Sequence, residues 1–358
     1  MKNLSDIAKE MGVSKSTVSY IYHDKWRAKR ISPVLAAKVI AKLKEGRAQP
    51  SMLGQQLRSG STQTAGLLLP NLDQPYFLQL LSGLERRLGQ DNTMLFLGNA
   101  HRGAVLRQTE FLEAMMARGV DRVILSPVPA DDLTEMLDRI RDRQVPLVFV
   151  NNYVRDYDIP FVVSDNRWAA KQLTAHLLAS GRRNILFFGA DQRVAVIMDR
   201  LMGYQDAFAE AGIKPPKDNV LWSKVLNEQG SFREVVSARL SGPNRPDAIF
   251  FDSLFISRRI VLMMHERGLK HPDDIIVCGF DYPVDLPRTI AFRETVLTPL
   301  LTIQQDANLM GQIAGELALN GQYGEAGERS IFVRPTLSWE EMVPGPLPNG
   351  RSYSPTVK

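Results

Sequence analysis

The chain of 358 residues has one cysteine, five histidines and no apolar run long enough to cross a membrane. A single cysteine excludes an internal disulfide, which agrees with a reducing cytoplasm. Cys278 lies in the apolar run IIVCGF, which favours a small core residue over a reactive thiol. The N-terminus lacks the apolar segment of a signal peptide. The sequence therefore predicts a soluble, cytoplasmic protein that does not contact a membrane.

The motifs of common enzymes are also missing. The sequence contains no GxxxxGK[ST], GxGxxG, HExxH or GxSxG pattern. The five histidines are not spaced as metal ligands, and no spacing pairs two carboxylates for acid/base chemistry. We therefore expect no catalytic residues, no metal and no cofactor, and we predict that the protein is not an enzyme.

Positive charge is concentrated at one end of the chain. Residues 1–60 carry 12 Lys and Arg against 4 Asp and Glu, a net charge of +8, whereas the whole chain has a net charge of +5. The remaining residues are therefore slightly acidic. A basic head on a slightly acidic body indicates a polyanionic partner at that end.

The most informative stretch is residues 4–22, LSDIAKEMGVSKSTVSYIY, which predicts two short helices joined by a tight turn. Gly12 can adopt the positive φ that ends the first helix, and Ser14 is a suitable N-cap for the second. On the second helix Val18 and Ile21 share one face, and the opposite face is polar. This pattern is typical of a helix-turn-helix whose second helix enters the major groove of DNA. The alternative is an ordinary helical hairpin with a solvated polar face.

The next segments favour the DNA-binding interpretation. Residues 23–30, HDKWRAKR, are strongly basic and suit contacts to phosphate groups. Ser32 and Pro33 are typical of a helix start, and apolar residues follow them at helical spacing. These apolar residues are Ala36, Val39, Ile40 and Leu43. We expect three helices around a small core, forming an independent head over residues 1–46.

A hinge is predicted at residues 47–64. The segment is rich in Gly, Ser, Gln and Thr, which is typical of a domain boundary. Within it, Leu53 and Leu57 stand one turn apart on a short potential helix that Gly54 weakens. We expect this helix to form only on a partner. The alternative is a plain flexible tether.

From residue 65 to residue 341, short apolar runs alternate with helical segments. This alternation predicts parallel sheets covered by helices on both faces, and the number of units implies two doubly wound α/β lobes. We expect lobe 1 at residues 65–163 and 305–325, and lobe 2 at residues 164–303 and 327–341.

In doubly wound lobes, ligands bind just beyond the carboxyl ends of the strands. Polar and aromatic residues follow several of the apolar runs here, so we expect a cleft supplied by both lobes to hold a small molecule. Helix capping alone would explain Asp165 or Ser253. Helix capping would not explain why the aromatic residues Phe77 and Trp168 also lie near the carboxyl ends of the predicted strands.

Together these features resemble the lactose/galactose repressor family of bacterial transcription regulators. The resemblance covers residues 2–341 and depends on several motifs that occur in order. They are IAKEMGVSKSTVSYI in the head, PSMLGQQL in the hinge, and VVSDN, HLLASG, DRLMGYQDAF, VCGFD and LTPLLTIQQD in the body. The resemblance implies a helix-turn-helix head and a body of the periplasmic-binding-protein type.

The resemblance implies DNA-binding positions in the head and hinge. In the head they are Leu4, Ser14, Lys15, Ser16, Thr17, Ser19 and Tyr20. Lys15, Ser16 and Tyr20 match positions that read base edges, although relatives often have arginine in place of Tyr20. Leu53 and Leu57 match the hinge residues that wedge into the minor groove of the operator and bend the DNA.

The resemblance also implies effector-binding positions in the cleft. They are Phe77, Trp168, Arg200, Ser253, Asp281 and Gln305. An arginine and an aspartate on opposite walls suit a polyhydroxylated ligand, because one donates hydrogen bonds and the other accepts them. We therefore expect a sugar or a sugar phosphate as the effector. Ser253 and Leu254 replace the Asn-Asp pair usual in the family, as in its fructose- and sucrose-type branch.

Residues 342–358 are rich in Pro and Gly and have no apolar heptads, so we expect a flexible tail. The leucine-heptad helix that joins four chains in some relatives is missing, which favours a homodimer on a near-palindromic, double-stranded DNA operator.

The predicted function is a ligand-controlled repressor of carbohydrate-metabolism genes. The alternatives are a transcription activator of the same family, a sugar-binding receptor without a gene-regulatory role, and an enzyme on the same fold.

Overall fold

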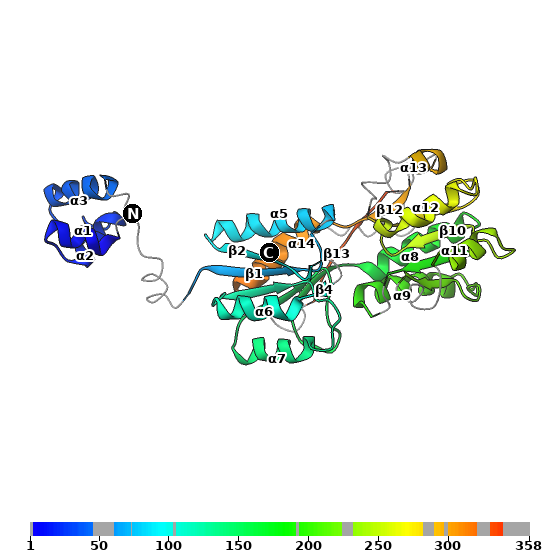
Figure 1. Ribbon diagram of the computed structural model, residues 1–358, viewed down its shortest axis with the longest axis horizontal. Coiled ribbons are helices and arrows are strands. Elements are labelled where there is room, and N and C mark those ends of the chain that lie inside the picture. The colour runs from blue at the N-terminus through cyan, green and yellow to red at the C-terminus, as the bar shows by residue number, and fades with distance from the viewer. Residues whose placement is uncertain are drawn as a thin grey trace. The chain divides into compact units, whose positions relative to one another are not determined.

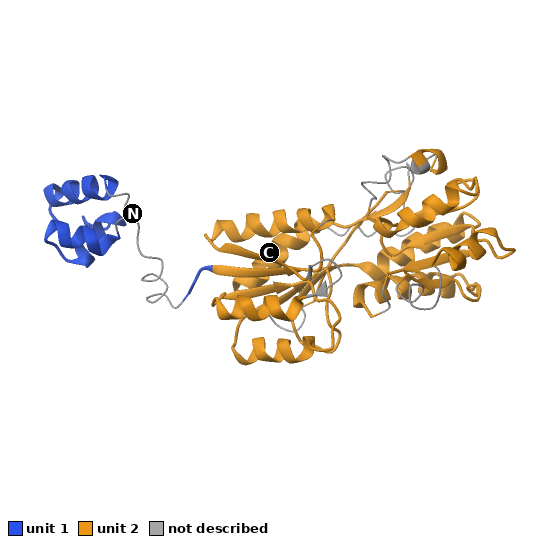
Figure 2. Ribbon diagram, viewed as in Figure 1, with its two compact units in different colours: residues 1–63 blue, residues 64–358 orange. Residues whose placement is uncertain are grey.

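The computed structural model describes residues 3–45, 61–72, 74–102, 105–190, 193–223, 232–281, 290–296, 300–320 and 330–338. The chain divides into two compact units, residues 1–63 and residues 64–358 (Figure 2). The hinge leucines Leu53 and Leu57 and the predicted tail at residues 342–358 lie outside the described residues.

The described residues of the first unit form three helices. They are α1 (Leu4–Met11), α2 (Lys15–Tyr22) and α3 (Pro33–Glu45). Gly12 ends α1 with φ 63°, and the Oγ of Ser14 accepts a hydrogen bond from the Thr17 N–H at 3.0 Å. Both features agree with the predicted helix-turn-helix.

The head has its own small core. It consists of Leu4, Ile7, Ala8, Val18, Ile21, Ala36, Val39 and Leu43. The prediction was wrong for Ile40, which is 37% exposed. Ile40 lies about 100° around α3 from Val39, so it falls beside the narrow stripe that faces α1 and α2.

The second unit consists of two lobes, each built on a six-stranded sheet (Figure 1). The strands of lobe 1 are, in spatial order, β13 (Ser330–Val333), β7 (Phe161–Ser164), β6 (Leu147–Val150), β5 (Arg122–Leu125), β1 (Thr64–Leu69) and β2 (Met94–Asn99). The strands of lobe 2 are β14 (Thr336–Leu337), β12 (Leu301–Gln304), β11 (Ile276–Phe280), β10 (Ala248–Phe251), β8 (Ile185–Gly189) and β9 (Val220–Trp222). Within these two sheets, all neighbouring strands run parallel except β12 and β14. The two predicted doubly wound lobes are confirmed.

Helices cover both faces of each sheet, which explains why the central strands are continuously apolar (Figure 1). The helices of lobe 1 are α5 (Pro75–Gln90) and α14 (Ala307–Asn320) on one face, and α6 (Gln108–Ala117) and α7 (Leu133–Asp142) on the other. Those of lobe 2 are α8 (Asn166–Ala179) and α9 (Ala195–Glu210) on one face, and α11 (Phe232–Ser241) and α12 (Arg258–His265) on the other. Four short elements complete the described chain: β3 (His101–Arg102), β4 (Val105–Leu106), the 3-10 turn η1 (Leu254–Ser257) and α13 (Ile290–Thr295).

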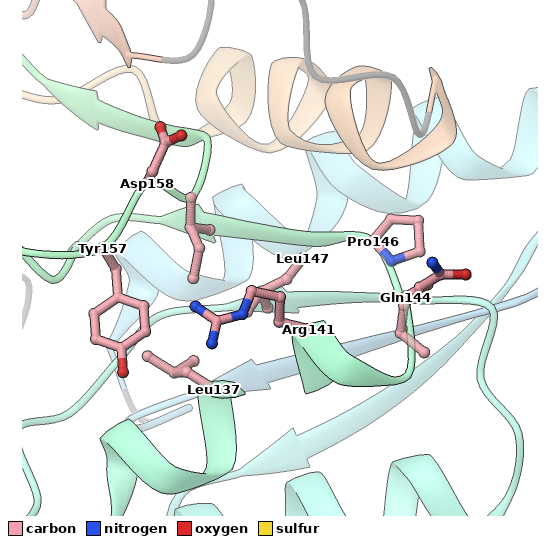
Figure 3. Close-up of a pocket in the computed structure, with 9 residues that line it drawn as sticks. Leu137, Arg141, Gln144, Pro146, Leu147, Tyr157 and Asp158 are labelled. Carbon is pink, nitrogen blue, oxygen red and sulfur yellow. The ribbon is translucent and has the colours of Figure 1, made fainter. Parts of the chain in front are cut away.

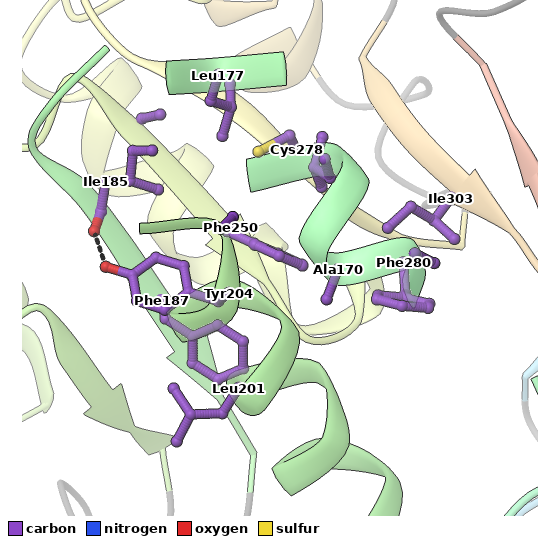
Figure 4. Packing of buried hydrophobic residues seen from close by; sticks show 14 of the residues in the cluster. Ala170, Leu177, Ile185, Phe187, Leu201, Tyr204, Phe250, Cys278, Phe280 and Ile303 are labelled. Carbon is purple, nitrogen blue, oxygen red and sulfur yellow. Dashed lines mark hydrogen bonds between the residues drawn. The ribbon is translucent and has the colours of Figure 1, made fainter. Parts of the chain in front are cut away.

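The core of lobe 2 beneath α8 and α9 is rich in aromatic rings (Figure 4). Phe187 on β8 and Phe250 on β10 meet edge to face, with their ring centroids 5.4 Å apart. Tyr204 on α9 is buried beside them, and its hydroxyl donates a hydrogen bond to the Ile185 carbonyl at 2.8 Å. Cys278 is buried in the same core, and burial raises the pKa of its thiol. The position of Cys278 agrees with the interpretation as a core residue.

Helices α5 and α14 pack in close contact through two glycines. A Cβ atom at Gly83 would lie 1.9 Å from the backbone oxygen of Asn308, and one at Gly311 would lie 2.1 Å from that of Leu80. Only glycine therefore permits this approach. The contact holds α14, which follows β12 in the chain, against lobe 1.

The chain crosses between the lobes after β7, after β12 and after β13. The predicted start of the last lobe 2 segment, residue 327, was wrong. Strand β13 pairs with β7 in lobe 1, and only β14 joins lobe 2. In β13 Phe332 is 53% exposed and Val333 is buried, an edge-strand pattern that fits either sheet. The sequence pattern therefore did not distinguish the two sheets.

Candidate functional site

Helix α2 presents a polar face. Of the predicted DNA-binding residues, Ser14, Lys15, Ser16 and Tyr20 are exposed, and Thr17 and Ser19 are half-buried. The hydroxyls of Ser14 and Thr17 share a hydrogen bond of 2.8 Å at the start of α2. A helix N-terminus with free N–H groups and hydroxyls favours contact with a phosphate group.

Leu4 differs from the other predicted DNA-binding residues. Its side chain is 5% exposed and belongs to the core of the head. At the start of α1 it occupies the apolar stripe that packs against the other two helices. The side chain is therefore not available to DNA, and a role for Leu4 in DNA binding stays a prediction.

The basic loop after α2 folds back onto that helix. The ammonium group of Lys29 lies 5.3 Å from the centroid of the Tyr20 ring, and the Lys25 N–H donates to the Tyr20 carbonyl at 2.8 Å. Trp26 anchors the loop, because it packs on the head core and its Nε1 donates to Asp24 Oδ1 at 2.9 Å. Lys29 thus accompanies Tyr20 on the exposed surface. The helical pattern of the sequence ends at Tyr22, so it does not predict the contact between Lys29 and Tyr20.

Four of the predicted effector residues meet where the strands of lobe 2 end. Asp281 follows β11, Gln305 follows β12, Ser253 follows β10, and Arg200 extends from α9. Ser253, Asp281 and Gln305 line a cavity of about 160 Å³. The other residues that line it are Gln74, Pro75, Tyr76 and Gln79 at the start of α5, with Phe255 and Gln304. The cavity therefore has walls from both lobes.

Arg200 is held beneath this cavity by a chain of polar contacts. It is 6% exposed, its Nε donates to Asn166 Oδ1 at 2.7 Å, and its Nη2 donates to Gln305 Oε1 at 3.3 Å. Its Nη1 donates to the backbone carbonyl of Asp252. The guanidinium carbon lies 3.7 Å from the centroid of the Phe280 ring. Three partners and an aromatic face therefore fix the orientation of the guanidinium.

Two carboxylates accompany this arginine. Gln305 Nε2 donates to both carboxylate oxygens of Asp281, at 3.0 and 3.2 Å. Burial raises the pKa of Asp281, although Arg200 and Gln305 lower it in part. Asp252 is 1% exposed, and burial raises its pKa to about 6 even though the Ala190 N–H donates to its Oδ2 at 3.0 Å. Asp252 is one of the polar residues that follow the apolar runs of the sequence and were expected at the cleft, but the family motif matches its neighbour Ser253.

Phe77 and Trp168 do not line the cavity. Phe77 is 5% exposed and packs in the core of lobe 1, and the adjacent Tyr76 lines the cavity instead. The Trp168 ring is covered by Arg334, whose guanidinium carbon lies 3.6 Å from the ring centroid. Arg334 also forms an ion pair with Asp165 at 2.8 Å. The expectation that these two aromatic side chains face the effector is therefore not supported.

A larger cavity lies elsewhere in lobe 1, at the start of β6 beside α7 (Figure 3). Its volume is about 540 Å³, and its lining consists of Leu137, Arg141, Gln144, Val145, Pro146, Leu147, Tyr157, Asp158 and Ile159. Arg141 is paired with Asp138 at 2.9 Å. None of the predicted effector residues lies there. The smaller cavity, with its convergent polar groups, is the better effector site.

The described part of the chain contains no helix that is long and apolar enough to span a membrane. It also contains no group of three His, Cys, Asp or Glu residues placed to hold a metal ion.

Comparisons with known proteins agree with this architecture. A family model described as "Periplasmic binding proteins and sugar binding domain of LacI family" matches residues 62–332. The transcriptional repressor PurR of Vibrio campbellii is 26% identical over 340 residues, which are 93% of this chain and 95% of the relative. The ribose operon repressor of Escherichia coli K12 is 26% identical over 320 residues, 89% of this chain and 93% of the relative.

A solved structure of the transcriptional regulator CelR in complex with cellobiose has the same fold. It matches 94% of this chain and 98% of its own, with a TM-score of 0.63 and 21% identity. The relatives are transcription regulators and not enzymes, which supports a non-enzymatic role at the level of the family. These names do not include the fructose- and sucrose-type branch, which stays a prediction. The chain belongs to the LacI family, that is, the lactose/galactose repressor family of DNA-binding transcription regulators.

Proposed function

We propose that this protein is a dimeric, cytoplasmic repressor of carbohydrate-metabolism genes, and that a small sugar-like effector controls its binding to a near-palindromic operator. One observation supports the proposal best. The same chain carries a helix-turn-helix with a polar outward face and a two-walled cavity lined by Gln305 and Asp281, with the buried Arg200 hydrogen-bonded to Gln305. The helix-turn-helix binds DNA. A small molecule bound in the cavity controls the shape of the body.

Gln305 connects the effector site to movement of the lobes. It lies at the crossover between β12 in lobe 2 and α14 in lobe 1, and it contacts both Arg200 and Asp281. The opposite wall of the cavity comes from α5 of lobe 1. A ligand that touches both walls favours one angle between the lobes and so shifts the balance between two states. Leu53 and Leu57 of the predicted hinge are proposed to respond by wedging into the operator or leaving it.

The size of the cavity suits a single sugar ring. A cavity of about 150 Å³ is known to hold one benzene molecule. The cleft cavity of about 160 Å³ is similar and is rich in polar side chains from Gln74, Gln79, Ser253, Asp281 and Gln305. These groups suit a ring with several hydroxyls. The E. coli relative named for the ribose operon and the cellobiose held by CelR agree with a sugar ligand.

The proposed dimer uses the outer edge of lobe 1. Strand β2 is the last strand of its sheet, and Met94, Phe96 and Leu97 on it are 63%, 36% and 39% exposed. Leu78 on the neighbouring α5 is 55% exposed. An exposed apolar edge strand is a typical protein interface. A second copy of the chain would cover this edge and bring two heads to one operator.

Selection of genomic fragments tests the proposed function. Purified protein is incubated with fragments of its source genome at near-physiological salt, and the retained DNA is sequenced. A near-palindromic motif upstream of carbohydrate genes is expected, and Lys15→Ala and Tyr20→Ala should change the preferred bases. Diffuse retention that disappears with added salt would show phosphate contacts alone and would contradict the proposal.

A further inference from the structure

Asp252 has a buried carboxylate oxygen that no described residue satisfies with a hydrogen bond. The residue ends β10 beside Ser253, which lines the effector cavity, and it is 1% exposed. Its Oδ2 accepts from the Ala190 N–H at 3.0 Å, whereas its Oδ1 has no partner among the described residues. Buried polar atoms are normally paired, so an orphaned carboxylate oxygen beside a ligand cavity calls for an explanation.

The local charges do not balance. Among the described residues of this cluster, Arg200 is the cation, and Asp252 and Asp281 are the two carboxylates. The hydrogen bonds of Arg200 go to Asn166, to Gln305 and to the backbone carbonyl of Asp252, so neither carboxylate receives one of them. Among the described residues, these buried side chains at and behind the cavity wall therefore carry more negative than positive formal charge, in a place with little water.

We infer that Asp252, together with Asp281, determines which charge the effector can carry. The ligand presents hydroxyl or amine donors to the two carboxylates, and sugars that carry phosphate or carboxylate groups are rejected. An anion placed close to two poorly solvated carboxylates is repelled strongly, whereas a donor satisfies the unpaired oxygen. This inference rests on the proposed function, because it concerns the effector of the same cleft. It narrows the expected ligands from sugar or sugar phosphate to the unphosphorylated class.

A purely structural role for Asp252 is the competing explanation. Its carboxylate joins the ends of β10 and β8 through the Ala190 N–H. Asp252→Asn separates the two roles, because the amide oxygen can still accept from Ala190 but the negative charge is lost. If the role of Asp252 were only structural, this variant would keep that hydrogen bond and leave the charge preference of the site unchanged.

The test uses a defined panel of ligands. D-ribose, D-fructose, D-glucose, D-glucosamine, ribose 5-phosphate, fructose 6-phosphate and glucose 6-phosphate are each titrated calorimetrically into the full-length protein. The wild type, Asp252→Asn and a control, Asp206→Asn, are compared. Asp206 lies on α9 and pairs with Arg167 at the surface of lobe 2. Circular dichroism establishes that the variants are folded.

We expect the wild type to bind an unphosphorylated sugar or the amino sugar in preference to every phosphate ester. Asp252→Asn should lower the ratio of that affinity to the affinity for the matching phosphate by at least about tenfold, and Asp206→Asn should leave it unchanged. Preferential binding of a phosphate ester by the wild type would overturn the inference, as would an unchanged ratio in Asp252→Asn or no binding from the panel. The genomic selection of operator DNA does not use these ligands. It therefore tests the proposed regulatory function independently of this inference.

Discussion

Arg155, on the loop after β6, forms an ion pair with Asp199 on α9, with 2.5 Å between Nη2 and Oδ1. Tyr153 on the same loop donates its hydroxyl hydrogen to Asp199 Oδ2 at 2.8 Å. The loop packs on the core of lobe 1, and α9 belongs to lobe 2. Both oxygens of one carboxylate therefore tie the lobes together at a point outside the cavity lining.

Replacing Asp199 should loosen the body. In Asp199→Asn the ion pair is lost, and because Arg155 is about half exposed we expect the contact to weaken by only about 1 kcal/mol. Small-angle scattering of the ligand-free protein should show a larger radius of gyration, and the affinity for the effector should change severalfold. Asp206→Asn on the same helix is the control, since Arg167 and Asp206 both lie in lobe 2. Identical scattering and affinity in Asp199→Asn and the wild type would show that this contact does not set the lobe angle.

Asp252 should reduce stability at neutral pH. Burial raises its pKa from 3.8 to about 6, so between these values the folded protein binds a proton more readily than the unfolded chain. Its unfavourable contribution is therefore full above pH 6 and is relieved as the pH falls towards 3.8. Asp252→Asn should raise the free energy of unfolding by about 1–3 kcal/mol near pH 7.5 and by much less near pH 4.5. Urea unfolding followed by tryptophan fluorescence measures both values, and a loss of stability at the higher pH would refute the assignment.

Lys29 should contribute to DNA binding through charge. It lies over the Tyr20 ring on the exposed surface of the head, where its ammonium group can reach phosphate. Lys29→Gln should weaken binding to all sequences and reduce the slope of log affinity against log salt by about 1. Lys29→Arg should preserve both. If Lys29→Gln instead changes the preferred bases without changing the salt slope, Lys29 reads bases and does not contact phosphate.

The two edges of the lobe 1 sheet give a matched test of the dimer. Phe96 on β2 and Phe332 on β13 are both exposed on edge strands of the same sheet, 36% and 53% respectively. Phe96→Lys should weaken dimerisation by about tenfold or more, because it places a charge in the apolar centre of the proposed interface. Phe332→Lys should have little effect. Sedimentation at several concentrations measures both variants, and the reverse result would move the interface to the β13 edge.

Local patterns in the sequence were sufficient for much of the fold. Gly12 and Ser14 predicted the turn of the head, because a positive φ and a helix cap depend on neighbouring residues. Alternating apolar runs predicted the doubly wound lobes, because each run and each helical segment likewise depends on neighbouring residues. The sheet to which β13 belongs depends on pairing with β7, more than a hundred residues earlier, so no local pattern contained it.

The site was predicted less completely, because the direction of a side chain depends on tertiary packing. Arg200, Asp281 and Gln305 meet, but the expectation of opposite walls was wrong, because Arg200 on α9 and Asp281 after β11 both belong to lobe 2. Phe77 and Tyr76 are adjacent, and only the packing of α5 on its sheet decides that Phe77 turns inward. The cover over Trp168 comes from Arg334, far away in the chain. The unpaired oxygen of Asp252 appears only when β8 and β10 lie side by side.

The effector response of Arg200→Ala tests the central claim most directly. Fluorescence anisotropy of a labelled operator, obtained from the genomic selection, is measured with and without the sugar that binds the wild type. We predict that this sugar changes the operator affinity of the wild type by about tenfold or more, and that Arg200→Ala and the milder Gln305→Ala bind the operator normally but do not respond. A normal response in both variants would contradict the account, and loss of DNA binding together with the response would show that these residues serve the fold and not the control of DNA binding.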